Sequence, residues 1–423
     1  MTSLVERDAR HLWHPYTQHA LEDPPLAVVG AKGSELELAD GRVLIDAISS
    51  WWACLHGHGV EPLVRAMESQ ARTLDHVLFA GATHEPAVRL AERLVEVAPP
   101  GLSRVFYSDD GSTAVEVALK MAYQAWVHAG EPERRVFVAL EGGYHGDTFG
   151  AMSVGEREPF FAAFAPLLFE ARRVAPAADA VAGALDELGG RAAGVVVEPL
   201  VQGAAGMRMH SERELAGMRA ACDRAGVPLI ADEVMTGFGR TGALFACTRA
   251  GVAPDLLCLG KGLTGGMLPL AATLATERVY EAFLFEDRAK TFFHGHTFTA
   301  NPIGCAVGIA SLDLALAGDV PARLDAIGAR IESELRARLG DVERVGALRR
   351  TGGIVALELR PPAGDVAGYG AALGPRLRRA AIERGVLLRP LGNVLYALPP
   401  ASTTDAQCET VARTMAELAR LGA

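Results

Sequence analysis

Hydrophobic residues in the middle of this chain fall in short runs of strand length, and longer amphipathic stretches separate one run from the next. This pattern predicts a mostly parallel β-sheet whose strands are joined by crossover helices. We therefore expect the largest unit of the chain to be an α/β domain. The predicted strands are residues 104–107, 136–140, 194–198, 229–232 and 256–259.

One predicted helix has a clear beginning. Thr113 and Glu116 have the spacing of a capping box, and good helix formers continue over residues 117–128 as far as Gly130. The sequence therefore predicts a helix that begins near Ser112.

The pattern differs at the two ends of the chain. Residues 39–42, Ala-Asp-Gly-Arg, lie between two alternating runs and predict a short β-hairpin. Near the other end, a long helical stretch at 305–339 precedes short strands near 354–359 and 386–388. These features predict a smaller α/β unit.

Composition narrows the class of partner. With 423 residues, of which 50% are hydrophobic, the chain can bury a large core and form two or three structural units. The formal net charge is -10 and no block is rich in Lys and Arg, which argues against nucleic acid or an anionic membrane surface as a partner. We expect a small-molecule partner.

The chain carries no pattern typical of export, membrane insertion or metal binding. Its charged amino-terminal residues lack the apolar core of a secretory signal, and no stretch is long and apolar enough to cross a bilayer. Six cysteines occur without a C-x-x-C pair, and two His-Gly-His segments, 56–58 and 294–296, have no acidic or thiol partners. We expect a cytoplasmic protein with reduced cysteines and assign no metal.

Lys261 is the first candidate for chemistry. It follows the apolar run 256–260 and precedes the glycine-rich segment 262–266. A lysine at a strand end beside open space is a candidate nucleophile, because partial desolvation weakens the hold of the amine on its proton. The alternative is a lysine whose amine simply reaches solvent.

Asp232 is the natural partner of this lysine. It ends the run 229–231, so its carboxylate is expected at the C-terminal edge of the sheet, where open α/β sheets bind ligands. An amine and a carboxylate on neighbouring strand ends suit pyridoxal phosphate, because the lysine can bond the aldehyde and the carboxylate can keep the pyridine nitrogen protonated. A structural ion pair between Asp232 and Lys261 is the alternative.

The third requirement of such a site is a cradle for phosphate. Residues 108–113 join a strand to a helix, where Gly111 allows close approach of the backbone and Ser112 adds a hydroxyl beside the positive end of the helix. A well-capped helix without a ligand would have the same pattern. Tyr144, in a glycine-rich loop, is a candidate to stack on a planar cofactor, with burial in the core as the alternative.

Residues 237–242, Gly-Phe-Gly-Arg-Thr-Gly, have the glycine spacing of a dinucleotide-binding fingerprint. A true fingerprint opens a crossover helix, but Gly251 and Pro254 interrupt the next stretch of chain. We interpret the segment as a loop and keep a nicotinamide-dependent dehydrogenase as the alternative class of enzyme.

These segments together resemble the class III, fold type I, pyridoxal-phosphate-dependent aminotransferases, and the match runs nearly end to end. The cofactor signature of that family matches residues 231–234, 236–242 and 260–262 in the expected order. One branch of the family, which acts in biotin synthesis, is also similar in local segments. These are residues 11–17, 49–52, 143–148 and 388–392, with Tyr396.

The resemblance implies a fold and an oligomeric state. It implies a large pyridoxal-phosphate-binding domain with a mostly parallel seven-stranded sheet flanked by helices, and a small α/β domain made from both ends of the chain. We place the N-terminal segment of the small domain at residues 1–50, the large domain at 51–305 and the C-terminal small domain at 306–423. It further implies a homodimer with shared active sites.

The resemblance also implies residue roles around the cofactor. Lys261 would bind pyridoxal phosphate and move a proton between the substrate and the cofactor. Asp232 would pair with the pyridine nitrogen, Val234 would pack on one ring face, and Tyr144 would cover the other side of the site.

Gly111 and Ser112 would bind the phosphate group, with Thr297 reaching in from the second subunit. His296, also counted with the cofactor-binding residues, stands where the family more often has proline.

For the substrates, the resemblance implies 8-amino-7-oxononanoate as amino acceptor and S-adenosyl-L-methionine as amino donor. Arg389 would clamp the carboxylate of the acceptor with two parallel hydrogen bonds. Tyr16 is counted with Lys261 as a catalytic residue. The substrate pocket is expected to contain Tyr16, Trp51, Trp52, Tyr144, Lys261, Gly295, Arg389 and Tyr396.

Different segments of the chain resemble enzymes that use different amino donors. Paired Trp51 and Trp52, with Tyr396, resemble the users of adenosylmethionine, whereas residues 294–296 resemble a minority branch that uses lysine. We favour adenosylmethionine, and we keep lysine as donor and another class III ω-amino acid transaminase as alternatives. The sequence assigns no role to Glu198, Gln202 or Asp147.

Overall fold

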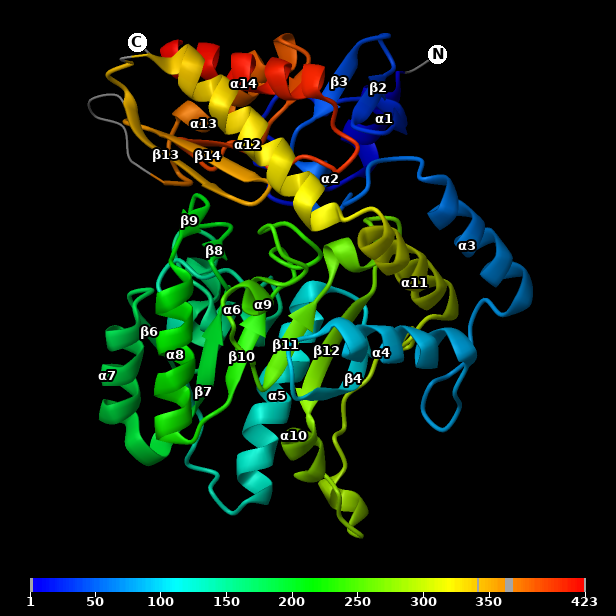
Figure 1. Ribbon diagram of the computed structural model, residues 1–423, viewed down its shortest axis with the longest axis vertical. Helices are drawn as coiled ribbons and strands as arrows, with labels where there is room; N and C mark the ends of the chain where they lie inside the picture. Colours follow the sequence, from blue (N-terminus) through cyan, green and yellow to red (C-terminus); the bar gives the residue numbers. More distant parts are fainter. Residues whose placement is uncertain (1–2, 341, 362–367, 422–423) are drawn as a thin grey trace.

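The computed structural model describes residues 3–340, 342–361 and 368–421. Its large unit is built on a seven-stranded sheet flanked by helices (Figure 1). Neighbouring strands are parallel except at β12, which runs antiparallel to the strands on both sides of it. In spatial order the strands are β4 (Leu102–Ser108), β12 (Ala271–Thr276), β11 (Leu256–Leu259), β10 (Leu229–Asp232), β7 (Ala192–Val197), β5 (Val136–Leu140) and β6 (Ala171–Val174).

All five predicted strands are confirmed, and β5, β10 and β11 have the predicted bounds. The sequence did not predict β6 and β12. β6 reads Ala-Arg-Arg-Val and β12 reads Ala-Ala-Thr-Leu-Ala-Thr, so neither contains a run of large apolar side chains.

Alternate residues of the strands point to opposite faces of the sheet and build two cores. Val195 and Val197 of β7 belong to one buried cluster, and Val196 between them belongs to the other. Helix α5 (Gly111–His128) packs on the second face, through Ala114 and Ala118. Because both faces are covered, the strands have continuous apolar sequences. The first face is covered by α4 (Glu85–Val97), α7 (Ala178–Leu188) and α8 (Glu212–Ala225).

Helix α5 begins one residue earlier than predicted and is capped differently. The Asp110 carboxylate accepts the Thr113 N–H at 3.0 Å, and the Asp110 N–H donates to the Thr113 hydroxyl at 3.1 Å. The predicted capping box of Thr113 and Glu116 is wrong, because Glu116 accepts a hydrogen bond from the Gly150 N–H instead.

The two ends of the chain form the smaller unit, which lies above the sheet in Figure 1. Strand β15 runs parallel to β3 and so joins the C-terminal segment to the N-terminal hairpin. The predicted hairpin and both predicted C-terminal strands are confirmed. One sheet contains β1 (Val28–Lys32), β2 (Glu35–Leu38), β3 (Val43–Asp46) and β15 (Val386–Leu387), and the other contains β13 (Val345–Thr351), β14 (Ile354–Leu359) and β16 (Val394–Ala397). Its helices are α12 (Val320–Leu339), α13 (Leu373–Glu383) and α14 (Asp405–Arg420).

The long helical stretch predicted at 305–339 consists of two helices, α11 (Pro302–Ala317) and α12, at an angle of 66°. Asp319 lies at the break with a φ of 43° and caps α12. The domain boundary predicted after residue 305 therefore lies inside α11, and the division of the chain into domains stays a prediction. Among the described residues, no single helix is both long and apolar enough to span a membrane, and only α11 and α12 taken as a bent pair have that length and composition.

The remaining elements are short or lie at the edges of the two units. The α-helices are α1 (Leu4–His11), α2 (Ser49–Trp52), α3 (Glu61–Thr73), α6 (Phe149–Val154), α9 (Ala246–Arg249) and α10 (Glu277–Glu281). A two-stranded ribbon contains β8 (Val201–Gln202) and β9 (Arg208–Met209), and 3-10 helices lie at Ala162–Leu167, Gly189–Arg191, Lys261–Thr264 and Arg288–Lys290.

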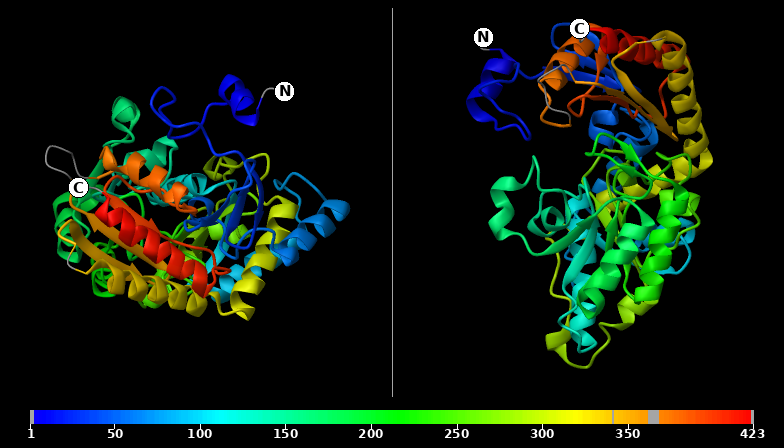
Figure 2. Two further views of the ribbon diagram at one scale, coloured as in Figure 1. Left: turned by 90° about the horizontal axis from the view of Figure 1, so that it is seen from above. Right: turned by 90° about the vertical axis from the view of Figure 1, so that its left-hand side faces the viewer.

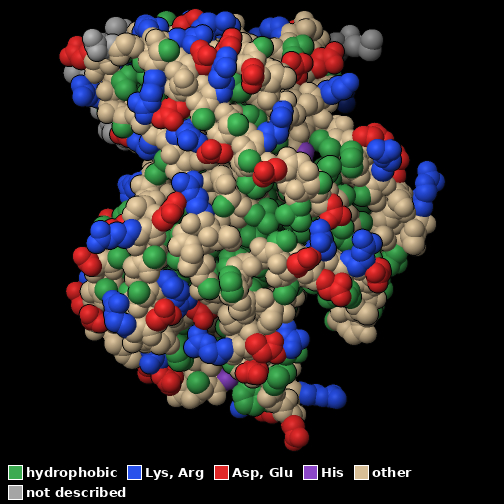
Figure 3. Space-filling model, viewed as in Figure 1, with side chains coloured by type: hydrophobic (Ala, Val, Ile, Leu, Met, Phe, Trp, Pro, Cys, Tyr) green, Lys and Arg blue, Asp and Glu red, His purple; other side chains and the backbone are tan. Residues whose placement is uncertain are grey.

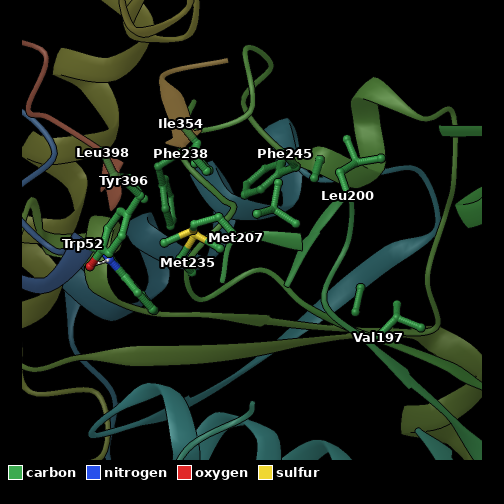
Figure 4. Packing of buried hydrophobic residues seen from close by; sticks show 14 of the residues in the cluster. Trp52, Val197, Leu200, Met207, Met235, Phe238, Phe245, Ile354, Tyr396 and Leu398 are labelled. Atoms are coloured by element: carbon green, nitrogen blue, oxygen red, sulfur yellow. Dashed lines mark hydrogen bonds between the residues drawn. The ribbon is translucent and has the colours of Figure 1, made fainter. Parts of the chain in front are cut away.

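The two units meet at a waist, which is visible in the space-filling view (Figure 3). In the right-hand view of Figure 2, the N-terminal segment reaches down toward the segment that contains α6, and the rings of Tyr16 and Phe160 lie 5.9 Å apart. At the centre of the waist, Trp52, Phe238 and Tyr396 lie in one buried cluster (Figure 4). The same hydrophobic core is thus shared by both units.

Candidate active site

A pocket of about 460 Å³ lies at the C-terminal edge of the parallel strands. This is the edge at which the sequence predicts a ligand. The structure brings seven of the predicted site residues into its lining. They are Trp52, Gly111, Ser112, Tyr144, Asp232, Val234 and Lys261.

Lys261 directly follows Gly260 at the end of β11 and begins a 3-10 helix. Its amine lies 5.3 Å from the centre of the Trp52 indole. Burial lowers the pKa of Lys261, although the negative charges of Asp232, Glu198 and Asp110 oppose the shift. The buried amine therefore loses its proton more readily than a lysine that simply reaches solvent, which suits a nucleophile.

Asp232 ends β10 and is paired with a residue that has no predicted role. Its Oδ2 atom accepts a hydrogen bond from His145 Nδ1 at 2.7 Å, and its Oδ1 atom accepts the Val234 N–H at 3.0 Å. Burial disfavours a charged imidazole, but the hydrogen bond and charge of Asp232 raise the pKa of His145 above its usual value. These hydrogen bonds fix the Asp232 side chain in position. The only signal in the sequence was the place of His145 beside Tyr144.

Glu198 holds the loop that contains Tyr144 and His145. Its carboxylate accepts the N–H groups of Tyr144 at 3.0 Å and Gly203 at 2.9 Å. Burial raises the pKa of Glu198 to about 7. Glu198 therefore holds the backbone that presents Tyr144 and His145.

The beginning of α5 leaves room for an anion against the backbone. A Cβ atom on Gly111 would lie 2.5 Å from Val234 Cγ1, and a Cβ atom on Gly146 would lie 2.2 Å from the Cβ of Ser112. Both glycines are therefore required by close packing. Gly111 and Ser112, the first two residues of this 18-residue helix, line the pocket. A helix N-terminus offers N–H groups and a positive dipole end, so a phosphate group fits there.

A second pocket of about 840 Å³ adjoins the first and contains Tyr16, Trp51 and Arg389. The Tyr16 hydroxyl donates to Asp147 at 2.6 Å and lies 2.9 Å from the Tyr144 hydroxyl, which connects the two pockets. The guanidinium of Arg389 lies 4.1 Å above the centre of the Trp51 ring. Asp147 had no predicted role, and the structure makes it the acceptor that orients both tyrosines.

The segment that carries the two tryptophans has an unusual backbone. Ser49, Ser50, Trp51 and Trp52 have φ angles of 50°, 43°, 70° and 76°. Four consecutive residues other than glycine thus lie in the left-handed region, which costs roughly 1–2 kcal/mol per residue. The surrounding structure must stabilise this turn.

His58 is one of the stabilising groups and gives a prediction about pH. The hydrogen bond to Asp46 raises the pKa of His58 to about 10, above its ordinary value of 6.5. The folded protein therefore holds this proton more tightly than the unfolded chain does. The resulting stabilisation is complete below the unfolded pKa and is lost as pH rises toward 10.

Between neutral pH and pH 10, we expect the free energy of unfolding of the native protein to fall by about 1 kcal/mol more than that of the His58→Gln variant. This value allows for solvent screening, because His58 is only partly buried. Urea denaturation from neutral to alkaline pH measures the difference. Parallel profiles for the two proteins would contradict the prediction.

Four predicted site residues, all of them described, line neither pocket. Tyr396 is buried behind Trp52 and accepts a hydrogen bond from its indole N–H at 3.0 Å. Gly295, His296 and Thr297 lie in a loop beside the beginning of α5, where His296 Nδ1 is 3.7 Å from Asp109. The exposed Thr297 does not reach the phosphate cradle of its own chain.

Residues 237–242 form a loop, as predicted, and the following α9 has only four residues. No crossover helix follows to receive a dinucleotide. Arg240 in this loop is buried and donates to the carbonyls of Pro399 and Trp52. The segment therefore joins the two units.

Comparisons with known proteins agree with this geometry. The sequence pattern of the family described as aminotransferase class-III matches residues 16–418. A curated relative from Synechococcus elongatus, named adenosylmethionine-8-amino-7-oxononanoate aminotransferase, is 51% identical over 96% of this chain and 98% of its own length. A relative of the same name from Geobacter sulfurreducens is 45% identical over 95% of this chain and 94% of its own length.

Solved structures are equally similar. The crystal structure of adenosylmethionine-8-amino-7-oxononanoate aminotransferase from Methanocaldococcus jannaschii has a TM-score of 0.94 and 36% identity, and 99% of each chain is covered. A PLP-bound amine transaminase from an uncultivated Pseudomonas species has a TM-score of 0.89 and 31% identity, over 96% of this chain and 98% of the other.

Proposed function

Because this chain belongs to the class III aminotransferases, we propose that it transfers an amino group from S-adenosyl-L-methionine to 8-amino-7-oxononanoate, a step of biotin synthesis. The product is 7,8-diaminononanoate. The observation that carries the proposal is the contact between the linings of two pockets, one with Lys261 and Asp232 and the other with Arg389 and two aromatic rings. Relatives that are named for this reaction cover nearly the whole chain.

The enzyme depends on pyridoxal phosphate, as class III aminotransferases do. When bound, this cofactor supplies an aldehyde that carries the amino group and a ring that withdraws electrons from the substrate carbon. Gly111 and Ser112 would hold its phosphate, Asp232 its pyridine nitrogen, and Val234 one face of its ring. The first pocket supports this assignment because a close-packed glycine, a helix N-terminus and a buried carboxylate lie in one lining.

Lys261 has two tasks in this proposal. Its desolvated amine would hold the cofactor through the aldehyde group, and once released it would move a proton at the substrate α-carbon. The carboxylate of Asp232, fixed by His145, would pair with the pyridine nitrogen. The Trp52 indole shields the amine of Lys261 on one side.

Arg389 and Tyr16 would recognise the acceptor. The acceptor has a carboxylate at the end of a long apolar chain, and Arg389 can form two parallel hydrogen bonds with it. The Trp51 ring orients the guanidinium, and Tyr16 contacts the same ring at 5.6 Å. The hydroxyl of Tyr16 is held by Asp147 on the side of the catalytic pocket.

The decisive experiment is product analysis. Purified holoenzyme is incubated with 8-amino-7-oxononanoate and, separately, with S-adenosyl-L-methionine or lysine as donor. We expect 7,8-diaminononanoate with adenosylmethionine and much less with lysine. If the product forms with lysine but not with adenosylmethionine, lysine is the amino donor. If neither donor gives the product, the proposed function is wrong.

A second candidate is an ω-amino acid transaminase of the same class. It is favoured by the structural similarity to a four-fold mutant of an ω-transaminase from Pseudomonas jessenii, with a TM-score of 0.92 at 27% identity over 98% of each chain. The same assay with ω-amino acids as donors and simple keto acids as acceptors separates the two functions.

Arg389→Ala should selectively weaken binding of the amino acceptor. Loss of hydrogen bonds to a charged group, roughly 1.5–3 kcal/mol, corresponds to a rise of about 10- to 100-fold in KM for 8-amino-7-oxononanoate. The rate of the first half-reaction with the donor, measured in single turnovers, should change little. Arg378→Ala is the matched control, since Arg378 lines the same pocket, and an equal effect there would contradict the assignment.

The homodimer and the cytoplasmic location are part of the same proposal. Thr297 would reach the phosphate site of a second copy, and the exposed rings of Phe293 and Phe298 beside it support an interface in this loop. Full activity of a monomer in sedimentation analysis would contradict the dimer. All six cysteines are free thiols, as expected in a reducing compartment.

A further inference from the structure

A buried carboxylate lies under the left-handed turn Ser49–Trp52. Asp46, the last residue of β3, has an exposed fraction of 0%. Its Oδ1 atom accepts the N–H groups of Ile48 at 3.3 Å and Ser50 at 2.9 Å. Its Oδ2 atom accepts the Ser50 hydroxyl at 2.7 Å and His58 Nε2 at 2.9 Å. Asp46 therefore receives four hydrogen bonds, two of them from Ser50 in the turn itself.

The other anchors of the turn lie at its two ends. The Ser49 hydroxyl donates to the carbonyl of Leu398 at 2.8 Å. The Trp52 carbonyl accepts a hydrogen bond from buried Arg240 at 3.2 Å. Backbone hydrogen bonds also close the turn, from the Trp52 N–H to the Ile48 carbonyl at 2.8 Å and from the Ala53 N–H to the Ser49 carbonyl at 2.9 Å. Among the side chains described, Asp46 and His58 are the ones that bond Ser50 in the middle of the turn.

The turn places the indoles of Trp51 and Trp52 in different pockets. Trp51 lies under Arg389 and beside Tyr16 in the outer pocket. Trp52 lies beside Lys261 in the inner pocket and is tied to Tyr396. In a right-handed or extended backbone, consecutive side chains would leave the chain in other directions, and these contacts would be lost together.

We propose that Asp46 is a positioning residue for the reaction, which acts by holding the left-handed turn that places Trp51 under Arg389 and Trp52 beside Lys261. His58 and Ser50 keep the carboxylate oriented. The inference rests on the proposed function for its kinetic readout, whereas its spectroscopic readout is independent of that function.

The spectroscopic test uses the full-length holoenzyme in a Trp13→Phe/Trp126→Phe background, which leaves Trp51 and Trp52 as the tryptophans. We expect Asp46→Asn to lose about half of the near-ultraviolet circular dichroism of the indoles, because rings released from a single packing arrangement lose their asymmetric surroundings. Far-ultraviolet circular dichroism should remain unchanged at the same temperature.

The kinetic test measures both half-reactions. Asp46→Asn should raise KM for 8-amino-7-oxononanoate about 10-fold through Trp51 and Arg389, and it should lower kcat by a smaller factor through Trp52 and Lys261. Asp40→Asn is the matched control, because Asp40 lies in the same hairpin but is exposed and paired with Arg42. It should leave both constants unchanged.

Ser50→Gly provides a rescue. Glycine adopts the left-handed region without steric cost, so the double variant Asp46→Asn/Ser50→Gly should recover most of the indole signal and most of the KM. A role in stability alone would leave KM unaffected by Asp46→Asn and so give nothing to rescue. If Asp46→Asn does not fold, Ser50→Ala removes one hydrogen bond to the carboxylate and should raise KM about 3-fold.

Unchanged indole signal and KM in a folded Asp46→Asn protein would overturn the inference, and so would a failure of Ser50→Gly to restore them. Failure of the native enzyme to aminate 8-amino-7-oxononanoate would instead contradict the proposed function, and the indole signal would still test Asp46.

Discussion

Replacement of Lys261 by alanine is expected to lower kcat/KM by at least about 10⁴-fold, the largest effect of any single substitution in this chain. In the proposed function the amine would bond the cofactor and move the proton at the substrate carbon, and among the described residues no other lysine lies in the lining of this pocket. The visible absorption band of the bound cofactor should also disappear. Absorption spectra and steady-state rates measure both effects.

The sequence offers a simple control for this prediction. The chain has four lysines, Lys32, Lys120, Lys261 and Lys290, so reduction of the holoenzyme with borohydride should attach the cofactor to one tryptic peptide. Lys32→Ala, on the exposed strand β1, should retain the band and the activity. Attachment to a peptide without Lys261, or a coloured and active Lys261→Ala protein, would contradict the assignment.

Asp232→Asn is expected to produce the second largest loss, a decrease in kcat/KM between about 10² and 10⁴-fold. Removal of one partner of a buried charged pair costs about 3–5 kcal/mol, and each 1.36 kcal/mol corresponds to a factor of ten in rate. Asparagine has nearly the same shape, but it cannot hold the pyridine nitrogen in its protonated form. It also removes the charge that raises the pKa of His145.

Asp109→Asn is the control for Asp232→Asn. It tests whether the loss of activity comes from the position of Asp232 or from the removal of any one negative charge in the pocket. Asp109 lines the same pocket but is more exposed and lies at its rim, 3.7 Å from His296. Its substitution should cost less than about tenfold in kcat/KM, since exposed pairs contribute little. Comparable losses in the two variants would show that Asp232 has no special role.

The fold was predictable wherever burial on both faces left long apolar runs. Strands β5, β10 and β11 were found with their bounds because each consists of large apolar residues. Strand β12 was missed because it consists mostly of alanine and threonine, although Ala271 and Ala275 are buried in the same cluster as residues of α5. The capping of α5 was mistaken because two capping patterns overlap in sequence, and only the position of Gly150 shows which partner Glu116 has.

The residues of the candidate site were also predictable only in part. Lys261, Asp232 and the Gly111–Ser112 helix start were found because each directly follows a predicted strand, and parallel strands end at one edge. His145, Glu198 and Asp147 received no role, because each bonds a partner in a distant segment, 87, 54 and 131 residues away in the chain. Asp46 had no signal, because nothing in the order Ser-Ser-Trp-Trp reveals four positive φ angles.

The sequence by itself determined the class of fold, the edge of the sheet that carries the chemistry, and the residues at the strand ends. These features depend on local patterns, since burial and backbone geometry restrict each residue according to its near neighbours. Only the tertiary structure decided which of those residues meet, how Trp51 and Trp52 reach two pockets from one turn, and which carboxylates hold them. Such contacts join segments that are distant in the chain, and their energies depend on distances and burial that no local pattern specifies.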